Sequence, residues 1–229
     1  MATDNTDATR PPSPDTAEHR RLAEAPGPDA DWRVWGPYVS GRQWGTVRED
    51  YSAHGDAWEF FPFEHAHTRA YRWGEDGIAG LSDRYGFLNV ATALWNGRDD
   101  RLKERYFGLT GPQGNHGEDV KEYWWHLDAT PTHSFAEHLY RYPQAAFPYS
   151  ELVERNAAAG FADDEVELAD LGLLEGNRFF DVEVQHAKAS ETDVVVRIIA
   201  TNHGPEAAPV HVVPQLWFRN TWSWGRDDR

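Results

Sequence analysis

The chain has 229 residues, a formal net charge of −16, no cysteine, and 11 tryptophans, 9 tyrosines and 11 phenylalanines. The lack of cysteine excludes disulfide scaffolds, cysteine zinc sites and thiol enzymes. The negative charge argues against nucleic-acid and anionic-membrane partners, because like charges repel. The acidic, polar N-terminus lacks the apolar run of a signal peptide or membrane span, so we expect a cytoplasmic protein.

Residues 1–30 differ in composition from the rest of the chain. They hold five of the 14 prolines and no aromatic residue. Such a segment cannot bury enough apolar surface to offset the entropy lost on ordering. We therefore expect a disordered Pro/Ala-rich tail over 1–30, with a docking arm as the alternative, followed by one β domain over 31–229.

The first part of the expected domain is unusually aromatic. Eleven aromatic residues lie between Trp32 and Trp73, interleaved with glycine and aspartate and without a helical stripe. This pattern predicts short strands and shaped loops. Residues 86–98 read as a strand ended by Asn96-Gly97, a strong hairpin signal that predicts a return strand over Leu102–Leu109. One or two helical turns over Arg101–Phe107 are the alternative.

The remaining elements also favour a β fold. Val120–Leu127 carries aromatic residues on both alternating faces, which predicts a strand covered on both sides inside a sandwich. Tyr149–Ala159 is the best helix candidate, with Gly160 as its expected C-terminal cap. Three alternating runs, 178–187, 193–201 and 209–218, predict an antiparallel meander. The expected class is a mainly β, antiparallel β-sandwich with one or two short helices.

Several residues have side chains suited to chemistry. His65 and His67 have the spacing of metal ligands on one strand face, but no third ligand is near in sequence. The acidic doublets at 49–50, 75–76 and 118–119 offer carboxyl groups, and an inverting glycosidase needs two of these about 6.5–9.5 Å apart. Ion pairs with nearby arginines are the competing interpretation, and calcium binding through the acidic loops also stays open.

Aromatic residues beside acidic and amide side chains also suit a neutral sugar. A pyranose ring stacks on an aromatic face while its hydroxyls bind polar groups. Trp44, Trp73 and Trp222 are candidate platforms because they lie near glycines. The alternative is that most tryptophans simply build a β core.

Seven strings of residues, occurring in order, resemble a known family. Together they are similar to the N-terminal region of bacterial glucosidase-like proteins related to glycoside hydrolase family 63, which includes the processing α-glucosidase I. The resemblance covers about Asp31 to Gly225. The strings are Trp35–Ser52, Ala70–Gly77, Leu94–Arg98, Gly114–Glu122, Asp128–Ser134, Tyr142–Tyr149 and Leu216–Gly225.

The resemblance implies an N-terminal β-sandwich joined to a C-terminal (α/α)6 barrel that hydrolyses α-glucosidic bonds of oligosaccharides with inversion. Its acid and base belong to the barrel, so no catalytic, metal or cofactor residue is assigned here, and this chain alone is expected to be inactive. The aromatic end, Thr221–Gly225, predicts a missing packing partner. A free-standing carbohydrate-binding module is the alternative. The loops expected to face the sugar carry Arg69, Trp73, Glu75, Asp76, His116, Glu118 and Asp119.

Overall fold

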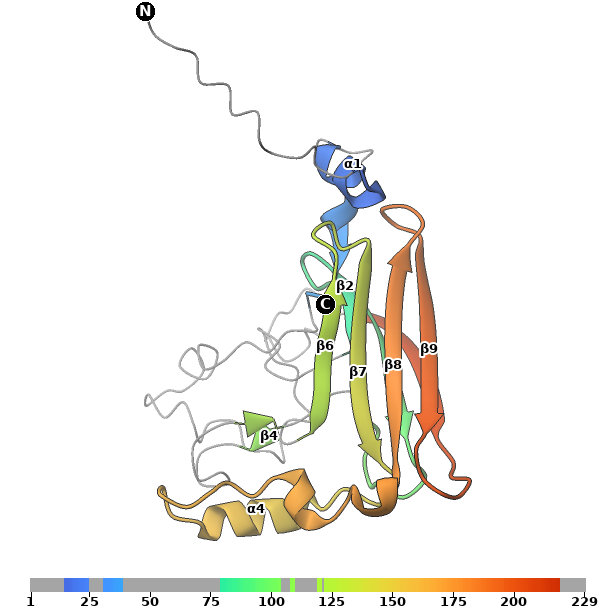
Figure 1. Ribbon diagram of the computed structural model, residues 1–229. Coiled ribbons are helices and arrows are strands. Elements are labelled where there is room, and N and C mark those ends of the chain that lie inside the picture. Colours follow the sequence, from blue (N-terminus) through green and yellow to red (C-terminus); the bar gives the residue numbers. More distant parts are fainter. Residues whose placement is uncertain are drawn as a thin grey trace, which may run out of the picture.

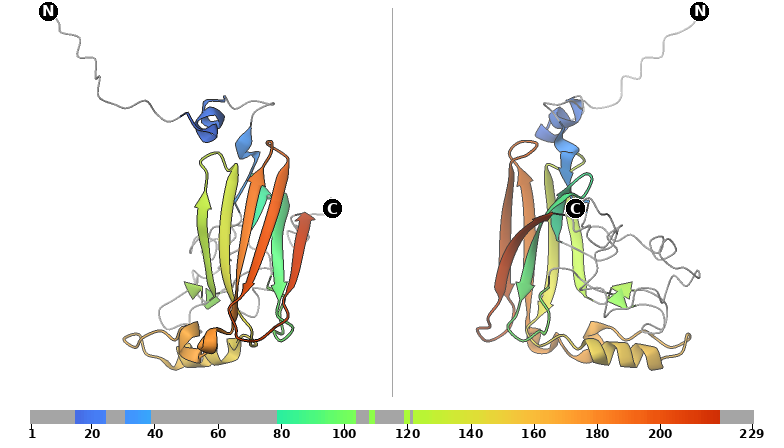
Figure 2. Two further views of the ribbon diagram at one scale, coloured as in Figure 1. Left: turned by 45° about the vertical axis from the view of Figure 1, so that its right-hand side comes forward. Right: turned by 180° about the vertical axis from the view of Figure 1, so that it is seen from behind.

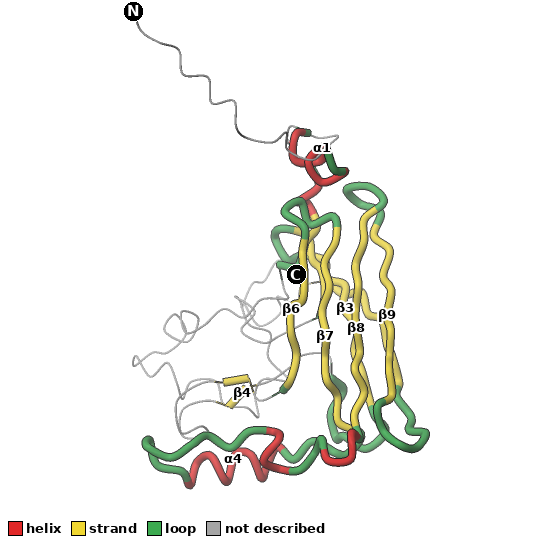
Figure 3. Tube along the Cα trace, viewed as in Figure 1, coloured by secondary structure: helices red, strands yellow, loops and turns green. Residues whose placement is uncertain are grey.

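The computed structural model describes residues 15–24, 31–38, 79–103 and 122–218, and the backbone alone of 108–109 and 119–120. Over these residues the protein is mainly β. Two four-stranded antiparallel sheets stack face to face (Figures 1 and 2), with helix α4 and several loops across one end (Figure 3). The expected antiparallel sandwich class is therefore confirmed.

The first sheet has the strand order β1-β2-β3-β10 and the second has the order β6-β7-β8-β9. A further pair, β4 with β5, forms a small two-stranded sheet. The strands of the first sheet are β1 (Trp35–Gly36), β2 (Gly80–Asp83), β3 (Leu88–Trp95) and β10 (His211–Phe218). Those of the second sheet are β6 (Tyr123–Ala129), β7 (Phe135–Pro143), β8 (Phe179–Lys188) and β9 (Val194–Asn202). The small pair is β4 (Gly108–Leu109) and β5 (Asp119–Val120).

The helical elements are short. The α-helices are α1 (Ala17–Ala23) and α4 (Tyr149–Ala158), and the 3-10 turns are η1 (Trp32–Val34), η3 (Leu168–Leu171) and η4 (Glu175–Asn177). The predicted helix at 149–159 is confirmed. Its C-terminal cap is Ala159 in an extended conformation, so the expectation that Gly160 would cap it is wrong.

Two hydrophobic clusters hold the described part of the fold together. The larger lies between the sheets and joins Leu94 of β3 to the inner faces of β7 and β8, including Tyr140, Phe180 and Val182. The smaller lies beneath α4 and centres on Leu152 and Leu168. On β8 every second residue is buried, because alternate side chains of a strand point to opposite faces of its sheet.

Three strand predictions need correction. The run 209–218 does form β10, but β10 pairs with β3 in the first sheet instead of continuing a meander after β9. The expected strand Val120–Leu127 is interrupted, and among the described strands β6 is an edge strand with largely exposed side chains. The strand expected after Asn96-Gly97 is reduced, among described residues, to a single bridge from Lys103 to Leu94 and the two residues of β4.

Two features lay outside the sequence predictions. Strand β7 was not predicted, because its buried face consists of Ala136, His138, Tyr140 and Tyr142 and has no aliphatic branched residue. Residues 17–23 form α1 inside the segment expected to be disordered. A capping hydrogen bond from the His19 amide to the Thr16 hydroxyl and contacts to the sandwich, described below, stabilise this turn of helix.

Candidate functional site

Six of the seven residues expected to face the sugar lie outside the described part of the chain, as do His65, His67 and the doublet 49–50. Asp119 is placed by its backbone in β5, opposite Leu109. The six residues outside the described part are Arg69, Trp73, Glu75, Asp76, His116 and Glu118. The described residues bring together three other groups of polar or aromatic side chains.

The first group is a buried ionic network at the α4 end of the sandwich. The Lys103 side chain is 0% exposed, and its ammonium donates to the Glu122 carboxylate at 2.6 Å and to the Tyr149 hydroxyl. The ammonium also lies 4.3 Å from the centre of the Phe147 ring, a cation–π distance. Lys103 reaches this position because the turn at Asn96-Gly97, where Gly97 has a φ of 77°, returns the chain to bridge with Leu94.

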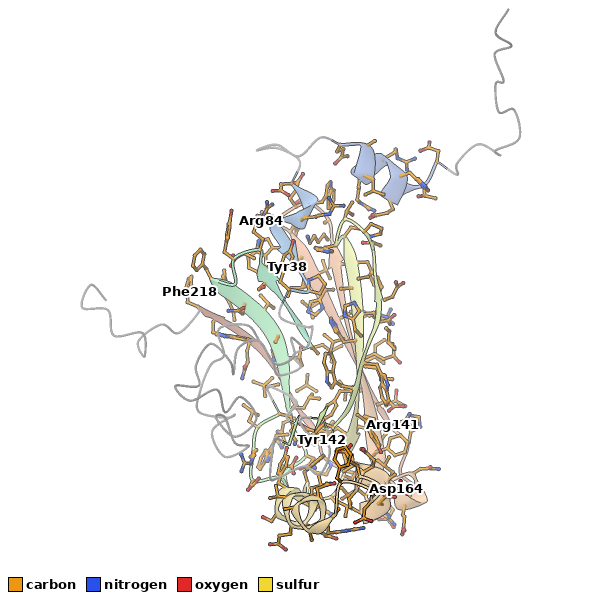
Figure 4. All side chains as sticks on the ribbon, turned by 90° about the vertical axis from the view of Figure 1, so that its left-hand side faces the viewer. Tyr38, Arg84, Arg141, Tyr142, Asp164 and Phe218 are labelled. Carbon is orange, nitrogen blue, oxygen red and sulfur yellow. The ribbon has the colours of Figure 1, made fainter. Side chains whose placement is uncertain are left out.

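Two tyrosines of β7 extend the same network. The Tyr140 hydroxyl donates to Glu122 at 2.8 Å, and the Tyr142 hydroxyl donates to the Asp99 carboxylate at 2.6 Å. Asp99 also accepts from the Phe147 backbone amide at 2.6 Å. Burial, and then the hydrogen bond to Asp99, raise the pKa of Tyr142 far above its usual range. Figure 4 shows Tyr142 at this end of the molecule, between the sheets and next to the helical segments.

This network holds two carboxylates, yet its geometry is that of a structural core. A general acid or base must come within hydrogen-bond reach of its substrate. The Glu122 and Asp99 side chains are 0% and 1% exposed, and each already accepts hydrogen bonds from protein donors. The network therefore joins β3, β7 and α4, and its carboxylates are shielded from a solute.

The second group is a row of histidines on the inner face of the second sheet. His126 of β6 pairs with His138 of β7, whereas His186 of β8 pairs with Ala136, two residues along β7 from His138. The His126 Nδ1 and His138 Nε2 atoms are 3.1 Å apart, and the rings of His138 and His186 are 5.9 Å apart. Within the described residues neither ring nitrogen of His186 has a hydrogen-bond partner, nor does Nδ1 of His138.

Burial keeps the inner histidines neutral. It lowers the pKa of His138 to about 3, with further lowering by the neighbouring His126 and His186, and it lowers the pKa of His186 to about 4. Among the described residues no three histidine, aspartate or glutamate side chains are placed to hold one metal ion, and this includes the histidine row.

The third group lies on the outer face of the second sheet. Trp125 of the edge strand β6 is 43% exposed and sits beside Tyr123, with ring centres 6.2 Å apart. The next positions across the sheet are Leu139 on β7 and Glu183 on β8. Along the strands this row is flanked by the bidentate Arg141–Asp181 pair and by Gln185, which donates to Glu137 at 2.6 Å.

The N-terminal segment is fastened to the opposite end of the sandwich from α4 (Figure 1). Glu18 of α1 accepts from the Thr132 amide at 2.7 Å, from the Thr132 hydroxyl at 2.8 Å and from the Ser134 hydroxyl at 3.0 Å. The Lys188 ammonium donates to the backbone carbonyls of Trp32 and Trp35. Burial lowers the pKa of Lys188 to about 8.

Sequence reasoning missed all three groups for identifiable reasons. Lys103, Asp99 and Glu122 are charged residues outside any recognised motif, and only the folded contacts show that they are buried. The histidine row has one member on each of three strands, so its members are far apart in sequence. Trp125 was treated as a core residue, and its edge position could not be predicted without the strand order.

Comparison with known proteins gives one relative and no family. No protein-family model matches the chain, and no solved structure matches it. The chain is 50% identical over 218 residues to a protein of Saccharomyces cerevisiae with the name Uncharacterized protein YMR196W. The match covers 91% of this chain and 20% of the yeast protein, so the chain spans about a fifth of the length of that relative. Of the described helices, none is long and apolar enough to cross a membrane.

Proposed function

We propose that this chain is the N-terminal, non-catalytic β-sandwich of a glycoside hydrolase that cleaves α-glucosidic bonds of oligosaccharides with inversion. The general acid and base belong to an (α/α)6 barrel outside the chain, and the sandwich supports that barrel. The resemblance of the ordered residue strings to the family 63 relatives supports the proposal, and the antiparallel sandwich class agrees with it.

The observation that carries the proposal is an open apolar edge formed by β9 and β10. Among the described strands these are the terminal ones of their sheets, and Figure 2 places them on the same side of the sandwich. On β10, the side chains of Leu216 and Phe218 are 67% and 76% exposed. Their partners on β3, Val90 and Leu88, are half-buried. Figure 4 shows Phe218 projecting away from the sheets. The other exposed apolar residues of this edge are Val195, Val196, Val212 and Val213.

An edge of this kind calls for a covering partner. Exposed strand edges carry unpaired backbone donors and acceptors, which can pair with another chain. Exposure of apolar side chains to water is also unfavourable, so both features favour burial against a partner. Known proteins blunt such edges with charge, proline or a covering element. Because the yeast relative is about five times as long as the matched segment, the remainder of a longer polypeptide is the covering element that we propose.

The buried network agrees with a supporting role. Lys103, Asp99 and Glu122 stabilise one end of the sandwich, and the carboxylates of Asp99 and Glu122 are both buried. In the proposed enzyme this stiff end carries α4, while the chemistry occurs in the barrel.

Enzyme assays on a chimera test the proposal. The matched fifth of the yeast relative is replaced by this chain, and glucose release from α-linked glucose disaccharides is followed by NMR, which distinguishes the anomers. We expect both the yeast protein and the chimera to release β-glucose first, and the isolated 229-residue chain to release none. A yeast protein and chimera without activity on any α-glucoside, or activity of the isolated chain, would overturn the proposal.

Variants at the β9–β10 edge test whether this edge contacts and supports the barrel. In the chimera, Leu216→Asp with Phe218→Asp should lower activity and thermal stability together, because the charges disrupt the covered edge. Phe161→Asp is the matched control, since Phe161 is also a highly exposed apolar residue but lies after α4, away from the edge. Equal effects of the edge and control variants would show that the β9–β10 edge is not a docking surface.

A further inference from the structure

We propose that the outer face of the second sheet binds a neutral glucose oligosaccharide, with Trp125 as the stacking surface and Glu183 as an acceptor for sugar hydroxyls. The choice of glucose rests on the proposed function, whereas the case for a neutral sugar rests on the face itself. This site is distinct from the seven residues expected from the sequence.

The spacing of the row suits a sugar ring. Trp125, Leu139 and Glu183 stand on three successive strands in register. Neighbouring strands are about 4.8 Å apart, so the backbones of Trp125 and Glu183 are separated by about 10 Å. We propose that a pyranose ring lies over Leu139, with its C–H face against the indole and its hydroxyls toward the carboxylate.

The flanking groups are already held in place. Arg141 forms two hydrogen bonds to Asp181, both of 2.8 Å, on one side of the row, and Gln185 is bonded to Glu137 on the other. Arg141 also lies with its guanidinium 4.4 Å from the Phe179 ring centre. Side chains fixed in this way lose little entropy when they bind a ligand, which raises affinity. The row thus has donors and acceptors on both sides along the strands.

One end of the platform is bounded by the segment after α4. The Tyr123 hydroxyl accepts from the Ala169 amide at 3.3 Å, and Tyr123 packs against the cluster of Leu152 and Leu168. Figure 4 shows Arg141 on this outer face and Asp164 of the same segment at its lower end. The aromatic pair Tyr123–Trp125 therefore lies beside the segment that follows α4, which contacts Tyr123.

The charges favour a neutral ligand over other classes. The face carries Glu137, Asp181 and Glu183 against Arg141 and Arg197, and the chain has a net charge of −16. Phosphorylated or acidic ligands are repelled by this balance, whereas a sugar without charge is not. Carboxylates, an amide and a guanidinium beside an exposed aromatic ring supply the polar contacts that orient a ligand in a binding site.

The chain contains a second exposed aromatic pair outside this row. Tyr85 and Phe87, in the turn before β3, are exposed, and their rings lie 5.9 Å apart at an interplanar angle of 34°. The Tyr123–Trp125 rings lie 6.2 Å apart at 30°. The two pairs have similar geometry. Substitutions in each pair therefore distinguish a specific sugar site from nonspecific binding of sugar to exposed aromatic rings.

Titration of the 229-residue chain with maltotriose tests the inference. Binding is followed by calorimetry and by NMR of the tryptophan indole N–H signals, with circular dichroism confirming that each variant is folded. We expect Trp125→Ala to weaken binding by about tenfold or more, since stacking on an aromatic ring is worth roughly that factor. Glu183→Gln should weaken it less, because the amide keeps an acceptor, and Trp125→Phe should keep part of the affinity.

A control variant distinguishes a specific maltotriose site at Trp125 from nonspecific binding to exposed aromatic residues. Phe87→Ala should leave maltotriose binding unchanged, and an equal loss in Trp125→Ala and Phe87→Ala would overturn the inference. Absence of maltotriose binding by a folded wild-type chain would overturn it too. That result is separate from failure of the proposed function, because the chimera can hydrolyse α-glucosides whether or not this face binds them.

Discussion

The Lys103 ammonium donates to the Glu122 carboxylate across 2.6 Å, and both side chains are completely buried. Their partners come from separate parts of the chain: Tyr140 is on β7, Tyr149 begins α4, and Asp99 follows β3. A buried charge pair of this kind costs desolvation energy and repays it only when every partner is present. It therefore fixes how these elements meet.

Removal of one partner should be severe. Lys103→Met leaves the Glu122 carboxylate buried without its cation, so we expect a loss of about 3–5 kcal/mol in the free energy of unfolding. Chemical denaturation measures this loss. Arg155→Ala, which removes the exposed Arg155–Glu151 pair, is the matched control and should cost no more than about 0.5 kcal/mol. A loss for Lys103→Met as small as that of the control would contradict the structural role.

Acid should destabilise the sandwich through the inner histidines. Their pKa values, about 3 for His138 and about 4 for His186, lie below the value of 6.5 expected in the unfolded chain. The unfolded state therefore binds more protons, and the stability contributed by neutral rings is present above pH 6.5 and falls as the pH drops toward 3–4. Thermal melts between pH 7.5 and 4.5 should show this decline.

A histidine variant checks that the decline comes from the row. His186→Leu removes a ring whose nitrogens have no hydrogen-bond partner among the described residues, so the melts should become less dependent on pH with little loss at pH 7.5. His211→Gln, at an exposed position on β10, should leave the pH dependence as in wild type. An unchanged slope in His186→Leu would exclude the row as its source.

Helix α1 should detach from the sandwich when the Glu18 carboxylate is removed. Burial raises the pKa of Glu18, but hydrogen bonds from Thr132 and Ser134 outweigh it, so the net pKa lies below the usual value. Glu18→Ala loses its three charge-assisted hydrogen bonds to the sandwich and its ion pair with Arg21, and we expect faster amide exchange across residues 17–23 and at Thr132. Asp15→Asn, which alters only the exposed Arg20–Asp15 pair, should exchange as wild type does. Equal exchange in all three proteins would refute this contact.

A methyl group at Gly36 should not fit. A Cβ at this position would lie 2.2 Å from the His133 ring, which stacks edge-on against Tyr38. We expect Gly36→Ala to cost about 1–3 kcal/mol in unfolding free energy, as overpacking usually does. In Gly160→Ala the added Cβ meets only a flexible Asp163 side chain, so this control should be milder. Addition of His133→Ala to Gly36→Ala should recover part of the loss, and its failure to do so would place the strain elsewhere.

The local pattern of apolar and turn-forming residues was enough to predict several strands and one helix. The run at β8 alternates apolar and polar residues, β9 is rich in β-branched residues, and α4 is bounded by turn residues, so the sequence alone indicated them. It also indicated the antiparallel β class. Alternation does not specify a neighbour, however, because each strand offers the same backbone groups to any partner. The pairing of β10 with β3 and the edge position of β6 were therefore decided by the tertiary structure.

The same distinction applies to the candidate sites. Net charge and aromatic content indicated a neutral ligand, since these quantities depend on composition alone. Three groupings join residues from separate parts of the chain: the buried pair of Lys103 and Glu122, the row from His126 to His186, and the exposed Trp125 beside Leu139 and Glu183. Only strand order and register bring such residues together, because a charged or aromatic side chain in the sequence has no preference for core or surface until its neighbours are placed.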